Sequence, residues 1–180
     1  TNHEDVAEIH ITGSDRTHDA IVWGPMAEQS TRKESNAPCI DKPITSELGN
    51  VSPWIIVPGN YTKKQLDFQA ENIVASITNN VSFNCIATKM LVTSQGWPQR
   101  ELLLNRIDEL LSRIPSRYAY YPGAIERFER FSGISLSSEA RQEAKLPWTL
   151  IRDVDPVAHP HMFQEESFVC VVGETTIDTV

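Results

Sequence analysis

Apolar and polar positions alternate in short blocks along the first part of the chain. Residues 6–11 alternate apolar and polar side chains, and this period of two predicts a strand. The Thr-Gly-Ser-Asp sequence that follows predicts a turn in which Ser14 or Asp15 caps a helix. We expect that helix over 16–29, with a break where Gly and Pro adjoin at 24–25.

The rest of the chain keeps alternating between strand-like and helix-like segments. Short apolar runs bounded by Gly, Pro or Asn predict strands, and apolar positions three and four apart predict helices. The helix expected over 98–114, with its Pro in the first turn, would have one apolar face formed by Leu102, Leu103, Ile107, Leu110 and Leu111. Further helices are expected over 63–79 and 124–131, strands over 43–48, 53–58 (buried), 89–93, 148–151 and 168–172, a loop over 30–41, and an exposed polar segment over 135–145.

The alternation of strands with helices predicts an α/β fold with mostly parallel strand pairing. The chain has 180 residues, which is enough for one domain or for parts of two. It contains no Gly-x-Gly-x-x-Gly sequence, so a complete dinucleotide-binding fold of the common kind is not expected. No internal repeat is visible in the sequence.

Charge and hydropathy exclude two classes of partner. The formal net charge is −8 and no basic run occurs, which argues against binding to nucleic acid. No apolar stretch is long enough to span a bilayer, so we expect no membrane partner. The first five residues are polar and acidic, which is unlike a signal peptide, and they lack an initiator Met. We therefore expect the chain to start inside a longer protein.

The number and spacing of the cysteines favour free thiols. The chain contains Cys39, Cys85 and Cys170. Because the count is odd and no two are close in sequence, neither a disulfide framework nor a zinc knuckle is expected. Free thiols suit a cytoplasmic protein. We expect Cys39, in a loop, and Cys170, in an apolar strand, to have structural roles only.

Two other groups of residues invite functional interpretation without supporting it. His159, His161 and Glu165 have a partial metal-ligand spacing, but neighbouring prolines favour a loop and no further ligand is evident. We therefore expect no metal site. The tyrosines at 118–121, like the tryptophans, are expected to pack against other side chains rather than to form a binding platform.

Four short sequences carry more information than the periodicity does. They are Ile-Thr-Gly-Ser at 11–14, Pro-Ile-Thr-Ser-Glu-Leu-Gly-Asn-Val-Ser-Pro at 43–53, Asn-Val-Ser-Phe-Asn-Cys-Ile-Ala at 80–87 and Glu-Glu-Ser-Phe at 165–168. In this order they resemble the aldehyde dehydrogenase superfamily. That family has Phe-Thr-Gly-Ser, Glu-Leu-Gly-Gly-Lys-Ser-Pro, Asn-x-Gly-Gln-x-Cys and Glu-x-Phe-Gly-Pro in the same order. The second sequence is the most specific match.

The resemblance implies a fold made of parts of two domains. Residues 1–48 would be the C-terminal part of a Rossmann-type cofactor-binding domain. Residues 49–180 would be most of an α/β catalytic domain, incomplete at its C-terminal end. The first half or so of a full enzyme would lie upstream of this chain. Family members are usually dimers or tetramers, so the parent enzyme is expected to be a homo-oligomer.

The same resemblance implies an oxidation of an aldehyde to a carboxylate with NAD or NADP. Cys85 would be the thiol nucleophile that attacks the aldehyde carbon, since a thiolate is the reactive species in such chemistry. Its backbone N–H would help to hold the developing oxyanion. Hydride transfer would leave a thioester, and Glu47 would deprotonate the water that hydrolyses it.

The resemblance also implies which residues contact the cofactor. Glu166 matches the carboxylate that binds the hydroxyls of the nicotinamide ribose, and Phe168 matches the aromatic residue beside the nicotinamide. The turn at 12–14 matches one near the pyrophosphate. The full set of implied cofactor contacts is Gly13, Ser14, Leu48, Gly49, Glu166 and Phe168. Nothing in the sequence chooses between NAD and NADP or names the aldehyde.

Several positions depart from the family pattern. Gly and Gln of the cysteine motif are replaced by Ser82 and Phe83, and the residues after the Glu-Leu-Gly sequence are Asn50 and Val51 in place of Gly and Lys. In the last motif Val-Cys stands at 169–170 where the family has Gly-Pro, and His18 stands where a Gly usually follows the Thr-Gly-Ser turn. These changes indicate a divergent subfamily.

Plainer interpretations exist for each site residue. A lone cysteine such as Cys85 is usually a small buried apolar residue. Glu47 and Glu166 could be surface acids, and the turn at 12–14 could simply cap a helix. At the level of function, one alternative is a non-catalytic structural or interaction module. Another is a CoA-acylating dehydrogenase, but such enzymes tend to lack an acid at the position of Glu47, so its presence favours hydrolysis by water.

Overall fold

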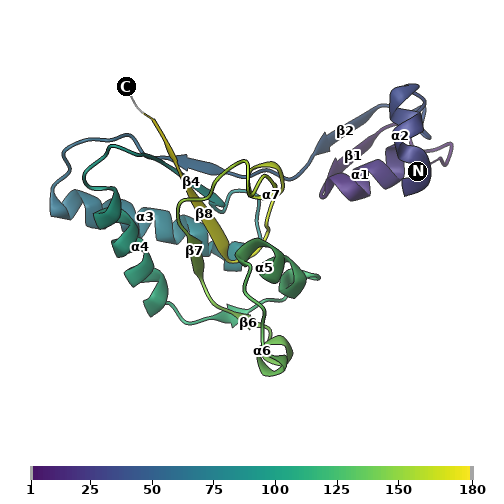
Figure 1. Cartoon of the computed structure of the whole chain (residues 1–180). Helices are drawn as coiled ribbons and strands as arrows, with labels where there is room; N and C mark the ends of the chain where they lie inside the picture. Colours follow the sequence, from purple (N-terminus) through teal and green to yellow (C-terminus); the bar gives the residue numbers. More distant parts are fainter. Residues whose placement is uncertain (1, 179–180) are drawn as a thin grey trace. The chain divides into compact units, whose positions relative to one another are not determined.

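A computed structural model describes residues 2–178 and divides the chain into two compact units. The first unit is Thr1–Gly49 and the second is Asn50–Val180. Each unit is described by itself below, with the element labels of Figure 1. Within residues 2–178, no helix combines the length and the apolar character that crossing a membrane requires.

The first unit joins two parallel strands through a pair of helices. Ile9 lies opposite Ile44, and Thr12 lies opposite Glu47. Two parallel strands cannot be joined by a tight hairpin, and the two helices supply the crossover. The strand predicted over 43–48 is confirmed. The elements are β1 (Ile9–Thr12), α1 (Asp15–Val22), α2 (Met26–Glu34) and β2 (Ile44–Glu47).

The helix expected over 16–29 is two helices, broken at the predicted Gly-Pro pair. Gly24 has φ of +82°, a left-handed conformation that glycine adopts at little cost. The loop expected over 30–41 is wrong in its first part, because α2 continues to Glu34. No residue of α2 is buried, so no apolar periodicity marks it; an i,i+4 ion pair of 2.8 Å between Arg32 and Glu28 supports it instead.

The second unit is built on a four-stranded sheet in the order β3-β4-β8-β7, and every pair in this sheet is parallel. A separate two-stranded antiparallel pair joins β5 and β6. The predicted α/β class with mostly parallel pairing is therefore confirmed. The strands are β3 (Pro53–Ile55), β4 (Met90–Ser94), β5 (Arg117–Tyr118), β6 (Lys145–Leu146), β7 (Thr149–Ile151) and β8 (Val171–Ile177); the helices are α3 (Lys63–Thr78), the 3-10 turn η1 (Asn79–Ser82), α4 (Arg100–Arg113), α5 (Ala124–Ser132), α6 (Ser138–Glu143) and α7 (His161–Gln164).

Both faces of this sheet are covered. Leu91 and Val172 belong to an apolar cluster formed with α3 and α4, whereas their neighbours Met90 and Val171 belong to a second cluster formed with α5. Successive side chains of a strand point to opposite faces, which explains this division. Figure 1 shows α3 and α4 on one side of the strands and α5 on the other. Buried parallel strands of this kind carry near-continuous apolar runs.

Helix α3 begins where the sequence predicts, because local side chains cap its first turn. The hydroxyl of Thr62 accepts a hydrogen bond from the Gln65 N–H, and the Gln65 side chain accepts one from the Thr62 N–H.

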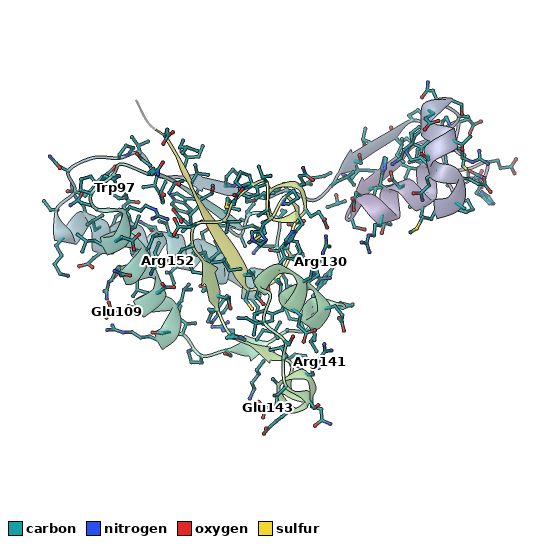
Figure 2. The ribbon with its side chains drawn as sticks, in the orientation of Figure 1. Trp97, Glu109, Arg130, Arg141, Glu143 and Arg152 are labelled. Atoms are coloured by element: carbon teal, nitrogen blue, oxygen red, sulfur yellow. The ribbon has the colours of Figure 1, made fainter. Side chains whose placement is uncertain are left out.

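Strand β4 leads into α4 through a turn that the side chain of Trp97 anchors. Its indole N–H donates to the carbonyl of Gly59 at 2.9 Å, and Figure 2 labels this side chain.

Three expectations about individual elements are wrong in detail. β3 is an edge strand whose Ile55 is 65% exposed, so the strand is not buried as expected. Helix α4 begins at Arg100 rather than with the Pro in its first turn, and its apolar face includes the buried Leu104 in place of Leu102, which is 60% exposed. Leu103, Ile107 and Leu111 of the predicted face are buried as expected, so only the border of the face differs.

The last third of the chain contains elements that the sequence pattern missed. The segment over 135–145 includes α6, capped by the side chain of Ser137. The strand expected over 168–172 begins only at Val171 and extends to Ile177. Phe168 has φ of +44°, so the backbone at the expected start of the strand is not extended. Polar residues within β8 hid its second half from a search for apolar runs.

Candidate functional site

Three of the four motifs meet at one edge of the second unit's sheet. Residues 50–52 lead into β3, residues 79–85 lie before β4, and residues 165–168 lie before β8. Because β3, β4 and β8 are parallel neighbours, their amino ends share an edge. Ligands of open α/β sheets usually bind at the carboxyl ends of strands. This candidate site therefore lies at the opposite edge.

Cys85 lies half-buried in a turn that the side chain of Asn84 holds on both sides. The Ala87 N–H donates to Asn84 Oδ1 at 2.6 Å, and Asn84 Nδ2 donates to the side-chain oxygen of Asn79 at 2.8 Å. An Asn that bonds to nearby backbone in this way stabilises a turn. The thiol is thus carried by a structured segment, although Cys85 belongs to no helix or strand.

Three consecutive residues before this turn have left-handed backbone. The φ angles are 47° at Asn80, 58° at Val81 and 64° at Ser82. A non-glycine residue in this conformation costs on the order of 1 kcal/mol or more, and a β-branched residue is the least suited to it. Ser82 stands where the resembled family motif has Gly, and its left-handed backbone is a conformation that glycine adopts at little cost. Its hydroxyl donates to the carbonyl of Ile77.

The segment at 50–52 contacts both other motif segments of this unit, residues 79–85 and residues 165–168. The Ser52 hydroxyl donates to the backbone carbonyl of Cys85 and also contacts the side-chain oxygen of Asn50. The backbone N–H of Asn50 donates to the carboxylate of Glu166. The link from Asn50 uses its main chain, so it does not depend on the side chain at this position.

Glu166 is half-buried, and its environment disfavours the charged form. Burial raises the pKa of the Glu166 carboxyl, and the positive charge of Lys89, the Asn50 N–H and Arg127 offset this only in part. Its Oε1 atom is buried and has no hydrogen-bond partner among residues 2–178. The same holds for Nε and Nη2 of Arg127, whose Nη1 donates to the carbonyl of Pro122 at 3.0 Å.

Lys89 is a site residue that the sequence reasoning missed. It directly precedes β4, is only 3% exposed, and its ammonium group donates to the carbonyl of Ser82 at 2.9 Å. Burial lowers the pKa of Lys89 to about 8, while the charges of Glu166, Cys170 and Cys85 act to raise it. A lysine inside an otherwise apolar segment was the only available signal, because lysine is almost never fully buried without a partner.

Aromatic rings pack around Phe83 of the cysteine motif. Phe83 packs on Tyr121 with ring centroids 5.7 Å apart and on Tyr120 at 4.9 Å, and Phe168 lies 4.8 Å from Tyr121. Two tyrosines of the 118–121 segment therefore do pack, as expected, although both remain about half exposed. Phe83, which replaces the family's Gln, is buried in this cluster.

The remaining predicted site residues belong to the first unit. Glu47 ends β2 with an exposed side chain, and its carbonyl accepts a hydrogen bond of 3.0 Å from the Gly13 N–H. Leu48 and Gly49 follow directly. Ser14 is the N-cap of α1, and its hydroxyl accepts from the Thr17 N–H. The plain capping interpretation of Ser14 is therefore confirmed, whatever else the turn does.

The other two cysteines differ from Cys85 in their surroundings. Cys39 is exposed in the first unit. Cys170 is 2% exposed, its thiol lies 3.3 Å from the carbonyl of Pro147, and burial raises its pKa to about 12. A thiol in such a place is almost entirely protonated at neutral pH.

The histidines at 159 and 161 do not gather a ligand set. Their ring centroids lie 6.1 Å apart. The nearby Glu165 forms an ion pair with Arg130, which Figure 2 labels. Among residues 2–178, no group of three or more His, Cys, Asp or Glu side chains is placed to hold a metal ion.

Comparison with known proteins gives one consistent result. No family model and no curated protein sequence matches the chain. Solved structures do match. An NADP-dependent glyceraldehyde-3-phosphate dehydrogenase from Bacillus halodurans, solved with NADP, is 20% identical with a TM-score of 0.68, over 98% of this chain and 36% of that chain. An NAD-dependent aldehyde dehydrogenase from Sinorhizobium meliloti is 19% identical, with a TM-score of 0.65, over 98% and 35%.

A third structure, a betaine aldehyde dehydrogenase from Staphylococcus aureus solved with NAD+, is 15% identical with a TM-score of 0.70, over 98% of this chain and 36% of that chain. At these identities the likeness establishes the fold. It also shows that the chain spans little more than a third of the length of each of these proteins. The sequence is accordingly a divergent chain with the fold of part of an aldehyde dehydrogenase.

Proposed function

We propose that this chain is part of an oxidoreductase that converts an aldehyde to a carboxylate with NAD or NADP. Residues 1–48 would complete a cofactor-binding domain and residues 49–180 would form most of the catalytic domain. The observation that carries the proposal is the convergence of the cysteine turn, the Asn50–Ser52 segment and Glu166 at one sheet edge. A homo-oligomer, either a dimer or a tetramer, is proposed on the resemblance alone, and a cytoplasmic location on the free thiols.

Cys85 is proposed as the nucleophile. Its thiolate would add to the aldehyde carbon, forming a C–S bond and placing the negative charge on the former carbonyl oxygen. The backbone N–H of Cys85 would hold that oxyanion. The contacts from Asn84 and Ser52 support this role, because a nucleophile must be held in place to gain from proximity.

The residues near Glu166 fit a nicotinamide cofactor. A buried carboxylate oxygen without a partner suits the hydroxyl groups of a ribose, and Phe168 offers an aromatic surface next to it. The first unit would contribute the backbone of Gly13, Leu48 and Gly49, with Ser14 capping the adjoining helix. When bound, NAD or NADP supplies an acceptor for the hydride that leaves the thiohemiacetal carbon, so that Cys85 retains a thioester.

Glu47 is proposed as the base that resolves this thioester. Its exposed carboxylate at the end of β2 can accept a proton from water. The resulting hydroxide would attack the thioester carbon, releasing the carboxylate product and returning the Cys85 thiolate. A positioned general base typically contributes about 10²–10⁴-fold to its step.

Rapid mixing of the full-length protein that carries this sequence tests the proposal. With aldehyde and cofactor, a Glu47→Gln variant should release a burst of reduced cofactor near one equivalent and then turn over at least about 100-fold more slowly. A Cys85→Ala variant should show neither the burst nor the steady state. Cys39→Ala is the matched control and should behave as the unmodified protein.

The outcomes separate the alternatives. Unchanged steady-state turnover in Glu47→Gln would remove Glu47 from the mechanism. If CoA then accelerated that turnover and an acyl-CoA formed, the protein would be a CoA-acylating dehydrogenase instead. If the unmodified full-length protein reduced neither cofactor with any of a panel of aldehydes, the interpretation as a non-catalytic structural module would replace this one.

A further inference from the structure

Lys89 is a buried cation that the proposed reaction does not use. Its main chain is fixed in the sheet, since its carbonyl accepts from the Gly173 N–H of β8 at 2.9 Å. Its side chain reaches back to the Ser82 carbonyl, three residues before Cys85. A group attached next to a strand and bonded across to the last residue of η1 has a well-defined position.

Burying an ammonium ion costs several kcal/mol unless nearby charges compensate for it. Three acidic groups act electrostatically on Lys89, namely Glu166, Cys170 and Cys85. Cys170 is a neutral thiol at neutral pH, because burial raises its pKa to about 12. The negative charges that remain are the Glu166 carboxylate and, when it forms, the thiolate of Cys85.

We propose that Lys89 is a positioning residue for Cys85, which fixes the turn before the cysteine through Ser82 and places a buried positive charge beside that turn. The inference rests on the proposed nucleophilic role of Cys85. Glu166 competes for the same charge, so the carboxylate and the thiolate are coupled through one ammonium group. This contact does not depend on the side chain at position 82, because Lys89 bonds to the main chain of Ser82.

Two alkylating reagents of different charge measure this effect in the 180-residue chain. Iodoacetamide is neutral and iodoacetate is an anion, so the ratio of their rates at one cysteine reports the local charge. The fraction of thiolate cancels from this ratio. Rates at Cys85 and Cys39 are followed at neutral pH by peptide mapping. In Lys89→Met the iodoacetate-to-iodoacetamide ratio at Cys85 should fall about three- to tenfold, while the ratio at Cys39 should not change.

Matched variants separate charge from shape. Lys89→Arg keeps the charge and a donor, and its ratio should stay within about twofold of the unmodified protein. Lys89→Gln keeps a donor that can reach Ser82 but has no charge, so its ratio should fall as in Lys89→Met. A Gln variant with an unchanged ratio would overturn the charge role, since the hydrogen bond alone would then be sufficient.

A change at Glu166 tests the same coupling without removing the lysine. Glu166→Gln frees the Lys89 charge, so the iodoacetate-to-iodoacetamide ratio at Cys85 should rise; an unchanged ratio would overturn the inference even if no Lys89 variant folded. Circular dichroism and thermal melting establish the folded state of each variant. If Cys85 reacts quickly but its iodoacetate-to-iodoacetamide ratio is the same in the Lys89 and Glu166 variants as in the unmodified chain, only this inference fails. If Cys85 in the unmodified chain reacts with iodoacetamide more slowly than Cys39, the nucleophile proposal itself fails.

Discussion

The side-chain hydroxyl of Ser52 donates a hydrogen bond to the main-chain carbonyl of Cys85, 33 residues further along the chain. This contact ties the end of one motif to the centre of another. Ser52 has φ of +46°, so the chain adopts a strained backbone at the residue that makes the link. Strain that persists next to a candidate nucleophile is typical of functional sites.

Replacing Ser52 with Ala should loosen the cysteine turn. One hydrogen bond is lost while the left-handed backbone remains, so the free energy of unfolding should fall by about 1 kcal/mol. Relative to the unmodified protein, amide hydrogen exchange over residues 84–87 should accelerate more than exchange in the rest of the second unit. Ser112→Ala is the control, because that hydroxyl bonds to Glu109 within its own helix. Unchanged amide exchange at residues 84–87 in Ser52→Ala would show that the turn is stable without this hydrogen bond.

Cys85 should be the most reactive of the three thiols. Cys170 is buried and its pKa is raised to about 12, so it should label only when the protein unfolds. Cys39 is the more exposed competitor. Iodoacetamide labelling at neutral pH, followed by peptide mapping, should modify Cys85 first, and a Cys85→Ser variant should leave Cys39 as the only thiol labelled under native conditions. Faster labelling of Cys39 would contradict the prediction.

Gly24 should resist substitution in the first unit. Its φ is +82°, and an added Cβ would lie 2.9 Å from Sγ of Cys39. Gly24→Ala should therefore lower the free energy of unfolding by about 1–3 kcal/mol, combining backbone strain with a steric clash. Gly96→Ala is the control, because no atom lies within 4 Å of the added Cβ. The double change Gly24→Ala with Cys39→Ala should recover part of the loss; no recovery would mean that the clash contributes nothing.

The sequence predicts most where local signals and periodicity agree. The start of α3, predicted from apolar spacing, coincides with the capping box of Thr62 and Gln65, and the break between α1 and α2 lies at the predicted Gly24 and its neighbouring proline. Helices without a buried face were missed or cut short, as the end of α2 and all of α6 show. Polar helices on the surface lack the apolar period on which such predictions depend.

The candidate site was only partly visible in the sequence for a different reason. Motif residues such as Cys85 and Glu166 could be named from their neighbours. Lys89 and Arg127 could not, because their importance comes from charges brought close by the fold, 77 residues apart in the case of Lys89 and Glu166. The left-handed backbone of Ser82 also has no local signal, since serine rarely adopts it.

A buried ion pair should make the second unit sensitive to acid. Glu174 in β8 is fully buried, and Arg100 donates to both of its carboxylate oxygens, from Nε at 2.9 Å and from Nη2 at 2.6 Å. Burial alone would raise the pKa of Glu174, but the hydrogen bonds from Arg100 and Thr93 hold it below its ordinary value of 4.5. The carboxylate is therefore bound more tightly in the folded state than in the unfolded chain.

The sign of the pH dependence follows from this lowered pKa. The stabilisation is fully present above pH 4.5, where the carboxyl group of the unfolded chain is also ionised, and it is lost as the pH falls through the lower folded-state pKa.

Glu174→Gln removes the main partner of Arg100 and should lower the free energy of unfolding by about 3 kcal/mol at neutral pH. The difference from the unmodified protein should shrink in acid, where Glu174 itself becomes neutral. Urea unfolding across this pH range measures both effects. Glu143→Gln, at an exposed carboxyl on α6 (Figure 2), is the control and should change neither. A Glu174→Gln deficit that stayed constant from neutral to acidic pH would mean that shape rather than charge at this position stabilises the sheet.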